Sequence, residues 1–317
     1  FKCDCPDQRD TMEPSQSEPY PKPQNRNPAP QNPMSQPLSI LVKQRLKSSY
    51  QRLRLRAIRR FQGFDTNDLV ALLGRLGIGP GAVVMVHCSW DGFAGFTGTP
   101  RDLLGILQEV VGSHGTLLMP TLPFTGLARD WAESGQVFDI RRTPSQMGLV
   151  SELFRRSRGV VRSLHPTHSV AAWGALAKVI TQDHHLCRTP CGAGSPYARM
   201  LEHNGINLLL GVDIRALTFF HAIEEIIRPI LPHDPFTKET WCLHSRDSDG
   251  KLWPTTTHLF EPNLSRRRDL RLIVPDLVHR GYYKKSHLHR LEATVIGCRD
   301  LLETLRELAE DGRYCYR

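Results

Sequence analysis

A buried strand, a turn and a helix follow one another in Leu208-Leu-Leu-Gly-Val-Asp213 and Thr218-Phe-Phe-His-Ala-Ile-Glu-Glu225. The apolar run from Asn207 to Val212 is continuous, which is typical of a strand covered on both faces. Polar side chains gather where this strand ends. Across the larger stretch from Arg142 to Glu225 they are more numerous than a hydrophobic core requires, and this concentration indicates an enzyme.

Strands and helices alternate through most of the chain. A β-branched run from Val83 to Val86 precedes a helix over 100–111, and a strand over 116–120 precedes a helix over 148–156, across a long loop from Thr121 to Arg142. Such alternation predicts an α/β fold. We expect a layered α/β/α domain with a central mixed sheet and with α+β elements at its C-terminal end.

Capping and turn residues place the other elements. Asp65 or Thr66 can cap a helix from Asn67 to Leu76 that stops at Gly77. The remaining expected elements are strands at 160–161, 169–173 and 207–212, a helix at 195–202, a hairpin over 241–260 around Asp247-Ser-Asp-Gly250, and a strand and helix over 291–308.

Length and composition fit one large α/β domain or two small ones. The chain has 317 residues, of which 40% are hydrophobic and 23% charged, enough for a substantial core. Residues 1–38 are rich in Pro, Gln, Asn and Ser and have almost no aliphatic residues to bury, so we expect a disordered tail there. We expect a basic helical arm over residues 39–64 and the folded domain over residues 65–317.

Positive charge is concentrated in this arm. Eight basic and no acidic residues lie between Lys43 and Arg60, and without them the formal net charge would fall from +9 to +1. The excess is therefore no evidence that the protein binds nucleic acid. The arm is either a solvated Arg-rich helix or a contact for an acidic partner, an anionic membrane surface or a CoA phosphate.

Cysteine usage and hydropathy favour a cytoplasmic setting. The eight cysteines are irregularly spaced, and no window of about 18 apolar residues is present to cross a membrane. The polar, Pro-rich start at Phe1 does not resemble a secretory signal. The sequence leaves open whether the protein forms a homodimer.

Thr218, His221 and Glu224 or Glu225 are predicted to share one face of a helix that begins near Leu217, because three or four residues separate them. A carboxylate one turn from an imidazole can fix the tautomer of the ring and raise its basicity. The other ring nitrogen is then free to take a proton from an attacking amine or hydroxyl. The same spacing also fits a surface salt bridge without chemistry.

The turn from His87 to Gly92 is a second, weaker candidate. It can present backbone amides to a phosphate or carbonyl oxygen, but it lacks the glycine patterns of dinucleotide and nucleoside triphosphate sites. Cys88 beside His87 could be a nucleophile, although neighbours on a strand point to opposite faces and do not readily form a pair.

His184, His185, Cys187 and Cys191 superficially resemble zinc ligands. Adjacent histidines diverge, however, and this cysteine spacing lacks the second tight pair that most structural zinc sites use. We therefore expect an ordered loop with buried thiols and no metal.

Several motifs together resemble the aminoglycoside 3-N-acetyltransferase family in order and spacing. They are Val86-His-x-Ser89, Gly115-Thr-Leu-Leu-Met-Pro120, Arg142-Thr-Pro-Ser-Gln-Met-Gly148, Val161-Arg-Ser-Leu-His-Pro-Thr-His-Ser169, Gly194-Ser-Pro196, Leu208-Leu-Leu-Gly211 and Thr218-x-x-His-x-x-Glu224. The resemblance covers roughly residues 65–308. It implies an α/β fold unrelated to the common acetyltransferase superfamily, and the transfer of acetyl from the cosubstrate acetyl-CoA to a primary amine.

By position, the resemblance also implies roles for individual residues. His221 corresponds to the general base, Glu224 to its orienting partner, and Thr218 to a hydroxyl that assists the thiolate or the tetrahedral intermediate of a direct attack. The side chains expected to line the CoA side of the cleft are Ser89, Arg162, Ser163, His168 and Ser169. For His165 and His168, a structural role within their turn is the alternative.

The acceptor is expected to be a small-molecule amine, an aminoglycoside or an amino sugar. A polycationic antibiotic requires a carboxylate-rich pocket, whereas the loop from Thr121 to Arg142 carries acidic and basic side chains in equal number. We therefore expect a biosynthetic amine more than an aminoglycoside. The alternative is a catalytically weak or inactive member of the family that acts as a binding or scaffold protein through its basic arm.

Overall fold

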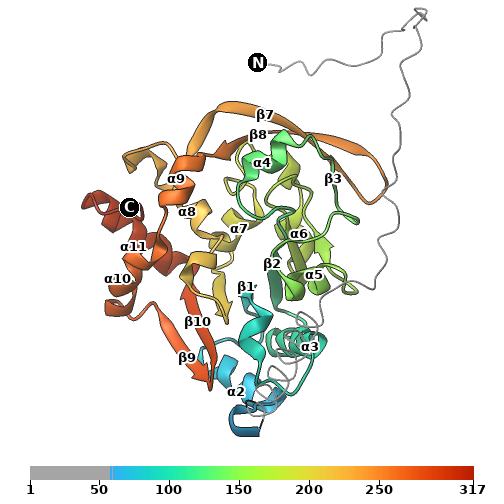
Figure 1. The fold of residues 1–317 in the computed structure, drawn as a ribbon, viewed down its shortest axis with the longest axis vertical. Helices are drawn as coiled ribbons and strands as arrows, with labels where there is room; N and C mark the ends of the chain where they lie inside the picture. Colours follow the sequence, from blue (N-terminus) through green and yellow to red (C-terminus); the bar gives the residue numbers. More distant parts are fainter. Residues whose placement is uncertain (1–57, 59) are drawn as a thin grey trace, which may run out of the picture. The chain divides into compact units, whose positions relative to one another are not determined.

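A seven-stranded mixed sheet forms the centre of the protein in a computed structural model that describes Ile58 and residues 60–317 (Figure 1). Its strand order is β4-β5-β2-β1-β6-β10-β9. The strands are β1 (Val83–Cys88), β2 (Thr116–Pro120), β4 (Val161–Arg162), β5 (Val170–Gly174), β6 (Ile206–Leu210), β9 (Lys284–Leu288) and β10 (Leu291–Gly297). β1 pairs in parallel with β2 and β6, and the outer pairs are antiparallel. The predicted tail and almost all of the predicted arm lie outside the described residues.

Helices cover both faces of this sheet, so the predicted α/β/α layering is confirmed. Val84 and Val86 of β1 point into one apolar core, and Val83 and Met85 point into the other, because successive side chains of a strand alternate between its faces. The first core packs against α2 (Thr66–Arg75), α3 (Pro100–Val111) and α5 (Leu149–Arg155). The second packs against α6 (Ala177–Thr181), α7 (Pro196–Glu202), α8 (Phe220–Ile226), α10 (Val274–His279) and α11 (Cys298–Glu310).

Side-chain caps fix the starts of two helices, and the first of these caps was predicted from the sequence. The Asp65 carboxylate accepts hydrogen bonds from the first turn of α2, and the Asp65 amide donates one to the Asp68 carboxylate. Thr99 and Asp102 form the same reciprocal box at the start of α3. Each box satisfies amide groups that have no partner within the helix.

A second, three-stranded sheet contains β3 (Phe138–Asp139), β7 (Phe236–Arg246) and β8 (Leu252–Phe260), which confirms the predicted hairpin. Figure 1 shows β7 and β8 as a long arch beside α4 (Ala128–Glu133). Both α4 and β3 lie within the segment 121–142, so the expectation of a plain loop there was wrong. β3 pairs with β7, about a hundred residues later in the chain, and local sequence patterns do not reveal such a partner.

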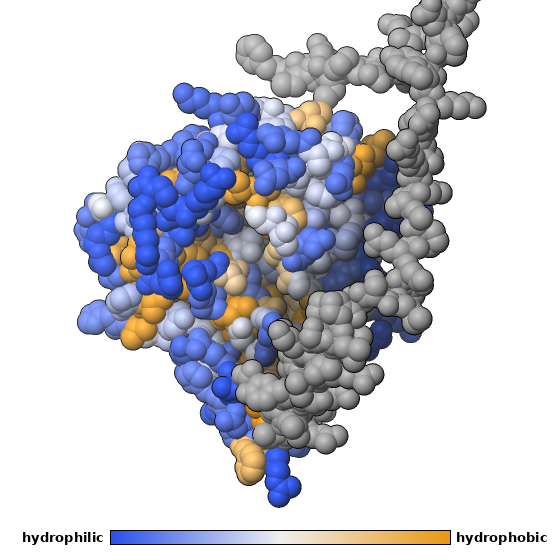
Figure 2. Space-filling model, in the orientation of Figure 1, coloured by the Kyte–Doolittle hydropathy of each residue, from blue (hydrophilic) through white to orange (hydrophobic). Residues whose placement is uncertain are grey.

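Short helices complete the described part of the chain. They are α9 (Pro262–Arg267) and the single-turn helices η1 (Trp90–Phe93), η2 (His184–Leu186), η3 (Ile214–Ala216), η4 (Arg228–Ile230) and η5 (Leu270–Ile273). Figure 2 shows a largely hydrophilic face with smaller apolar areas between the polar residues. Among the described residues, no helix has the length and apolar character needed to span a membrane.

Candidate active site

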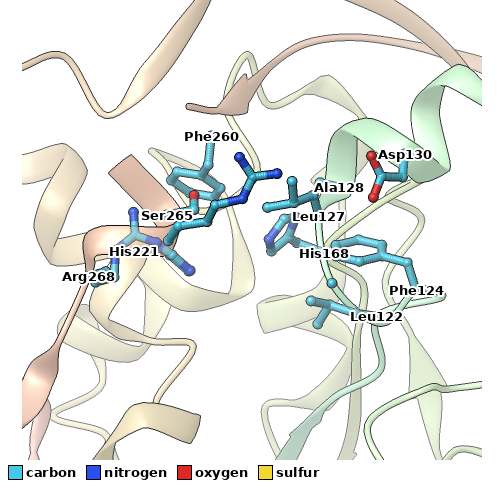
Figure 3. A pocket seen from close by; sticks show the side chains of 12 residues that line it. Leu122, Phe124, Leu127, Ala128, Asp130, His168, His221, Phe260, Ser265 and Arg268 are labelled. Atoms are coloured by element: carbon cyan, nitrogen blue, oxygen red, sulfur yellow. The ribbon is translucent and has the colours of Figure 1, made fainter. Parts of the chain in front are cut away.

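An open cavity of about 540 Å³ lies between the segment after β2 and the segment around α9. Figure 3 shows Phe260, Ser265, His221 and Arg268 on one side, across from Leu122, Phe124, Leu127, Ala128 and Asp130 on the other, with His168 also at the cavity. One wall is therefore mainly apolar. The opposite wall carries an imidazole and arginines.

His221 projects from α8 into this cavity and is held on one edge by a carboxylate. Its Nδ1 lies 3.1 Å from Oε2 of Glu224, and the Phe260 ring stacks on the imidazole with centroids 4.1 Å apart. Only 18% of the His221 side chain is exposed. Within residues 60–317 no group hydrogen-bonds Nε2, which leaves that nitrogen available to a ligand.

Glu224 is fully buried behind His221 and remains ionised. Both of its oxygens accept hydrogen bonds from Arg268 Nη2 at 2.8 Å, and Oε1 also accepts one from the Tyr316 hydroxyl. Burial opposes ionisation, but the hydrogen bond from His221 and the charge of Arg268 hold the pKa of Glu224 below its usual value. The residue is thus a buried anion with its charge balanced.

His221 is neutral at neutral pH. Burial lowers its pKa, the nearby Arg268 lowers it further, and Glu224 opposes both effects. Because the ionised Glu224 can only accept a hydrogen bond, the ring proton is on Nδ1 and the lone pair is on Nε2. This is the protonation state in which a histidine can take up a proton.

Thr218 lies two residues before α8 begins, so the prediction that Thr218, His221 and Glu224 share one helix face was wrong for the threonine. Leu217 is followed by a turn, in which the His221 amide donates to the Thr218 carbonyl at 3.1 Å. Thr218 lines a second cavity, of about 90 Å³. Thr218 therefore faces one cavity and His221, three residues later, faces the other.

His87 and Cys88 at the end of β1 also line this second cavity. Burial lowers the pKa of His87 to about 4 and raises the pKa of Cys88 to about 12. Both side chains are therefore uncharged near neutral pH, and a protonated thiol is a poor nucleophile. Ser89, expected near CoA, follows β1 but lines neither cavity.

Arg162 and Ser169 lie in the interior instead of lining a cavity. Arg162 Nε donates to Thr121 Oγ1 and Ser169 Oγ, each at 3.1 Å, and its guanidinium reaches the Thr143 carbonyl at 2.6 Å. The group also lies over the Phe138 ring. Burial lowers the pKa of Arg162 to about 9. These contacts tie β4 and β5 to the segment 121–143.

Ser163 is also internal, whereas His168 reaches the main cavity. Ser163 Oγ lies 2.8 Å from His184 Nδ1 and accepts from the Val170 amide at 2.8 Å. His168 Nδ1 lies 3.0 Å from Thr167 Oγ1, and its ring meets that of His221 edge to face at 6.1 Å. Of the residues expected to line the CoA side, His168 alone lines either of the two cavities described above.

The histidine and cysteine cluster before α7 is internally bonded. His184 uses Nδ1 for Ser163 and Nε2 for the Pro190 carbonyl, at 2.9 Å. Over the described residues, no group of three or more His, Cys, Asp or Glu side chains is arranged to hold a metal ion. Burial raises the pKa of Cys187 to about 11, so this thiol is protonated.

Phe260, Arg268 and Tyr316 complete the surroundings of the His221–Glu224 dyad. None of the three was predicted from the sequence. They come from the end of β8, the segment after α9 and the end of the chain. None stands in a motif with His221. Only the fold brings them together, so no local pattern could have identified them.

The fold and the site define an α/β protein with a proton-accepting histidine, backed by a buried carboxylate, in an open cavity. This chain belongs to the aminoglycoside 3-N-acetyltransferase family, whose model matches residues 85–310. It is similar to aminoglycoside N(3)-acetyltransferase VII of Streptomyces paromomycinus, with 35% identity over 167 residues. That match covers 49% of this chain and spans 58% of the relative's own length.

Solved structures support the fold. The crystal structure of AAC(3)-Xa matches 83% of this chain and 99% of its own, with a TM-score of 0.71 and 24% identity. AAC-IIIb, solved as a binary complex with CoASH, matches 80% of this chain and 99% of its own, with a TM-score of 0.67 and 21% identity. A histidine-to-alanine mutant of AAC(3)-IVa in complex with apramycin matches 78% of this chain and 93% of its own, with a TM-score of 0.61 and 26% identity.

Proposed function

We propose that this protein is an N-acetyltransferase that moves acetyl from acetyl-CoA to a primary amine of an amino-sugar-like or aminoglycoside acceptor. The observation that carries the proposal is the neutral His221, backed by the buried Glu224 and facing the cavity. Membership of the family supports the same reaction.

His221 acts as the general base in this proposal. An attacking primary amine gives up a proton as its nitrogen bonds to the acetyl carbon, and Nε2 of His221 takes that proton. The imidazolium that forms is stabilised by Glu224, whose buried negative charge lies 3.1 Å from Nδ1. The carbon–sulfur bond of the thioester breaks, and the leaving sulfur takes up the proton that the imidazolium releases, so CoA leaves as the thiol and His221 returns to its neutral form.

The second cavity fits the thioester end of acetyl-CoA, which supplies the acetyl group. It is narrow, about 90 Å³, and mainly apolar, with the Thr218 hydroxyl at one side. Nε2 of His87 is buried there without a hydrogen-bond partner in the described part of the chain. In this proposal the Thr218 hydroxyl donates a hydrogen bond to the leaving sulfur, and the amine approaches from the cavity of His221. A relative of the same fold was solved with CoASH.

The acceptor carries few positive charges in this proposal. Asp130 is the one carboxylate that lines the main cavity, which also has Arg266 and Arg268 in its walls. Glu224 already balances Arg268. A polycation would gain little attraction here, so we infer an amino sugar or similar amine before a multiply charged antibiotic. AAC(3)-IVa, by contrast, was solved with apramycin.

Thiol release from acetyl-CoA tests the proposal. Purified protein is assayed against amino sugars, aminoglycosides and simple amines, with His221→Ala as the control. We expect turnover on at least one amine and a loss of about 10²–10⁴-fold in the variant, the usual contribution of a general base. Equal rates in both proteins would remove His221 from the mechanism. Failure to bind acetyl-CoA would contradict the proposed reaction itself.

A further inference from the structure

Glu224 is surrounded by donors that come from three separate parts of the fold. His221 on its own helix donates through Nδ1, Arg268 follows α9, and Tyr316 belongs to the last residues of the chain. The Arg268 guanidinium reaches both carboxylate oxygens. A fully buried carboxylate with this many charged and polar donors has one orientation only.

Arg268 is itself held in place by aromatic rings. Its guanidinium lies 5.6 Å from the Phe220 ring centroid and 5.8 Å from that of Phe260. Phe260 in turn stacks on His221. Arg268 therefore contacts the dyad by two routes, directly through Glu224 and indirectly through the ring that packs on the imidazole.

A C-terminal strap, residues 313–317, fixes Tyr316 against the segment after α9. The Asp269 amide donates to the Cys315 carbonyl at 2.7 Å, and the Arg317 amide donates to the Arg267 carbonyl at 2.9 Å. Arg313 makes two hydrogen bonds with Asp276, at 2.8 and 2.9 Å. Tyr316 and Arg268 thus lie side by side on paired backbones, both aimed at one carboxylate.

Little space is available for water to replace these donors. The cavity next to Glu224, lined by Phe220, Tyr314, Cys315 and Tyr316 among others, measures about 10 Å³. A water needs roughly 10–15 Å³ on this measure, together with two to four polar partners. Removal of the Tyr316 hydroxyl takes one donor from Glu224 Oε1 and leaves Arg268 as its hydrogen-bond donor within the described residues.

We propose that Arg268 and Tyr316 are positioning residues that share the charge of Glu224, so that His221 keeps a fixed ring orientation and an unprotonated Nε2. Neither residue needs to touch the acceptor or the cosubstrate for this role. The inference deepens the proposed function and rests on His221 as its base.

The charged and titratable groups around His221 act on its protonation in opposite senses. Arg268, after α9, opposes protonation of the ring, and Glu224, on α8, favours it. His168, from the turn before β5, meets the ring at 6.1 Å and is itself held neutral by burial. Across the cavity lies Asp130. Loss of a donor to Glu224 concentrates its negative charge on the His221 hydrogen bond, so the imidazolium becomes more stable.

The test is the titration of the His221 ring by NMR in full-length Tyr316→Phe and Arg268→Met, a readout that needs no turnover. We expect the midpoint to rise by roughly half a unit in Tyr316→Phe and by about one unit or more in Arg268→Met, where a full charge is lost. Tyr314→Phe is the matched control, because Tyr314 lies on the same strap and lines the same small cavity. Its midpoint should stay at the wild-type value.

An unchanged midpoint in folded Tyr316→Phe would overturn the inference, as would an equal rise in Tyr314→Phe. If Arg268→Met does not fold, Arg268→Lys and Arg268→Gln take its place. Arg268→Lys keeps the positive charge but loses the planar guanidinium that reaches both Glu224 oxygens. Its His221 midpoint should lie nearer to the wild-type value than that of the uncharged Arg268→Gln. The pKa that defines the acid limb of the pH profile of kcat/KM should rise together with the NMR midpoint. A midpoint that moves without any change in rate supports the positioning role and counts against the proposed reaction.

Discussion

At the level of single residues, burial has opposite consequences for two side chains of the site. It raises the pKa of Cys88 to about 12 and lowers the pKa of His221, and in both cases the neutral form is favoured. A neutral thiol is inactive as a nucleophile, whereas a neutral imidazole is the active form of a base. The same physical effect therefore excludes one candidate and supports the other.

Cys88→Ser should consequently keep the rate of acetyl transfer within about twofold of wild type, because no step needs a thiolate there. Alkylation by iodoacetamide at pH 8, followed by mass spectrometry, should label the exposed Cys242 much faster than Cys88. A large loss of rate in Cys88→Ser, together with fast labelling of Cys88, would instead identify a reactive cysteine.

At the level of elements, the sequence predicted those strands and helices whose signals are local. The cap at Asp65 and the apolar runs of β1, β2 and β6 are examples. The sequence did not predict α4 or β3, because β3 depends on pairing with β7. The spacing pointed to His221 with Glu224 or Glu225, and the family resemblance singled out Glu224, which the structure places beside His221. Arg268 and Tyr316 reach Glu224 only through tertiary structure.

Arg162 shows how a motif residue can serve the arrangement of elements. Its hydrogen bonds to Thr121, Ser169 and the Thr143 carbonyl join β4 and β5 to the segment that leads to the cavity. Arg162→Lys should lower the free energy of unfolding by about 2–4 kcal/mol, since lysine keeps the charge but cannot replace all the hydrogen bonds that the guanidinium donates to buried oxygens. The KM for acetyl-CoA should stay unchanged.

Urea unfolding and initial rates check this expectation. Arg156→Lys is the control, because Arg156 is a largely exposed arginine paired with Glu152 and should change stability by less than about 1 kcal/mol. A raised KM for acetyl-CoA with normal stability in Arg162→Lys would contradict this expectation and indicate that Arg162 contacts the cosubstrate.

At the level of the whole molecule, several buried histidines are neutral in the folded protein. Burial lowers the pKa of His87 to about 4 and that of His184 to about 3, and it lowers those of His165 and His168 well below the usual value. Their stabilising contribution is therefore complete above the unfolded value of 6.5, and it is lost as the pH falls below that value. Glu225, whose pKa burial raises, acts in the opposite sense but is a single group.

The protein should thus be stable from pH 7 to 8 and should weaken steeply between pH 6.5 and 5. His87 and His184 each cost roughly 2 kcal/mol at pH 5, at 1.36 kcal/mol per unit. His165 and His168 add to this cost in the same sense, and the sum is a large part of the total stability of a domain. Urea midpoints followed by tryptophan fluorescence at successive pH values measure this. A midpoint that is flat or rises from pH 7 to 5 would contradict the neutral buried state of these side chains.

A double-mutant cycle of acetyl-transfer rates measures whether Glu224 acts through His221. His221→Gln, Glu224→Gln and the double variant are compared with wild type on the best acceptor, after far-UV circular dichroism has shown that each is folded. If Glu224 acts through His221, the double variant should be no slower than His221→Gln alone, because an orienting carboxylate has nothing to orient once the imidazole is gone. Losses that multiply, or full activity in His221→Gln, would contradict it.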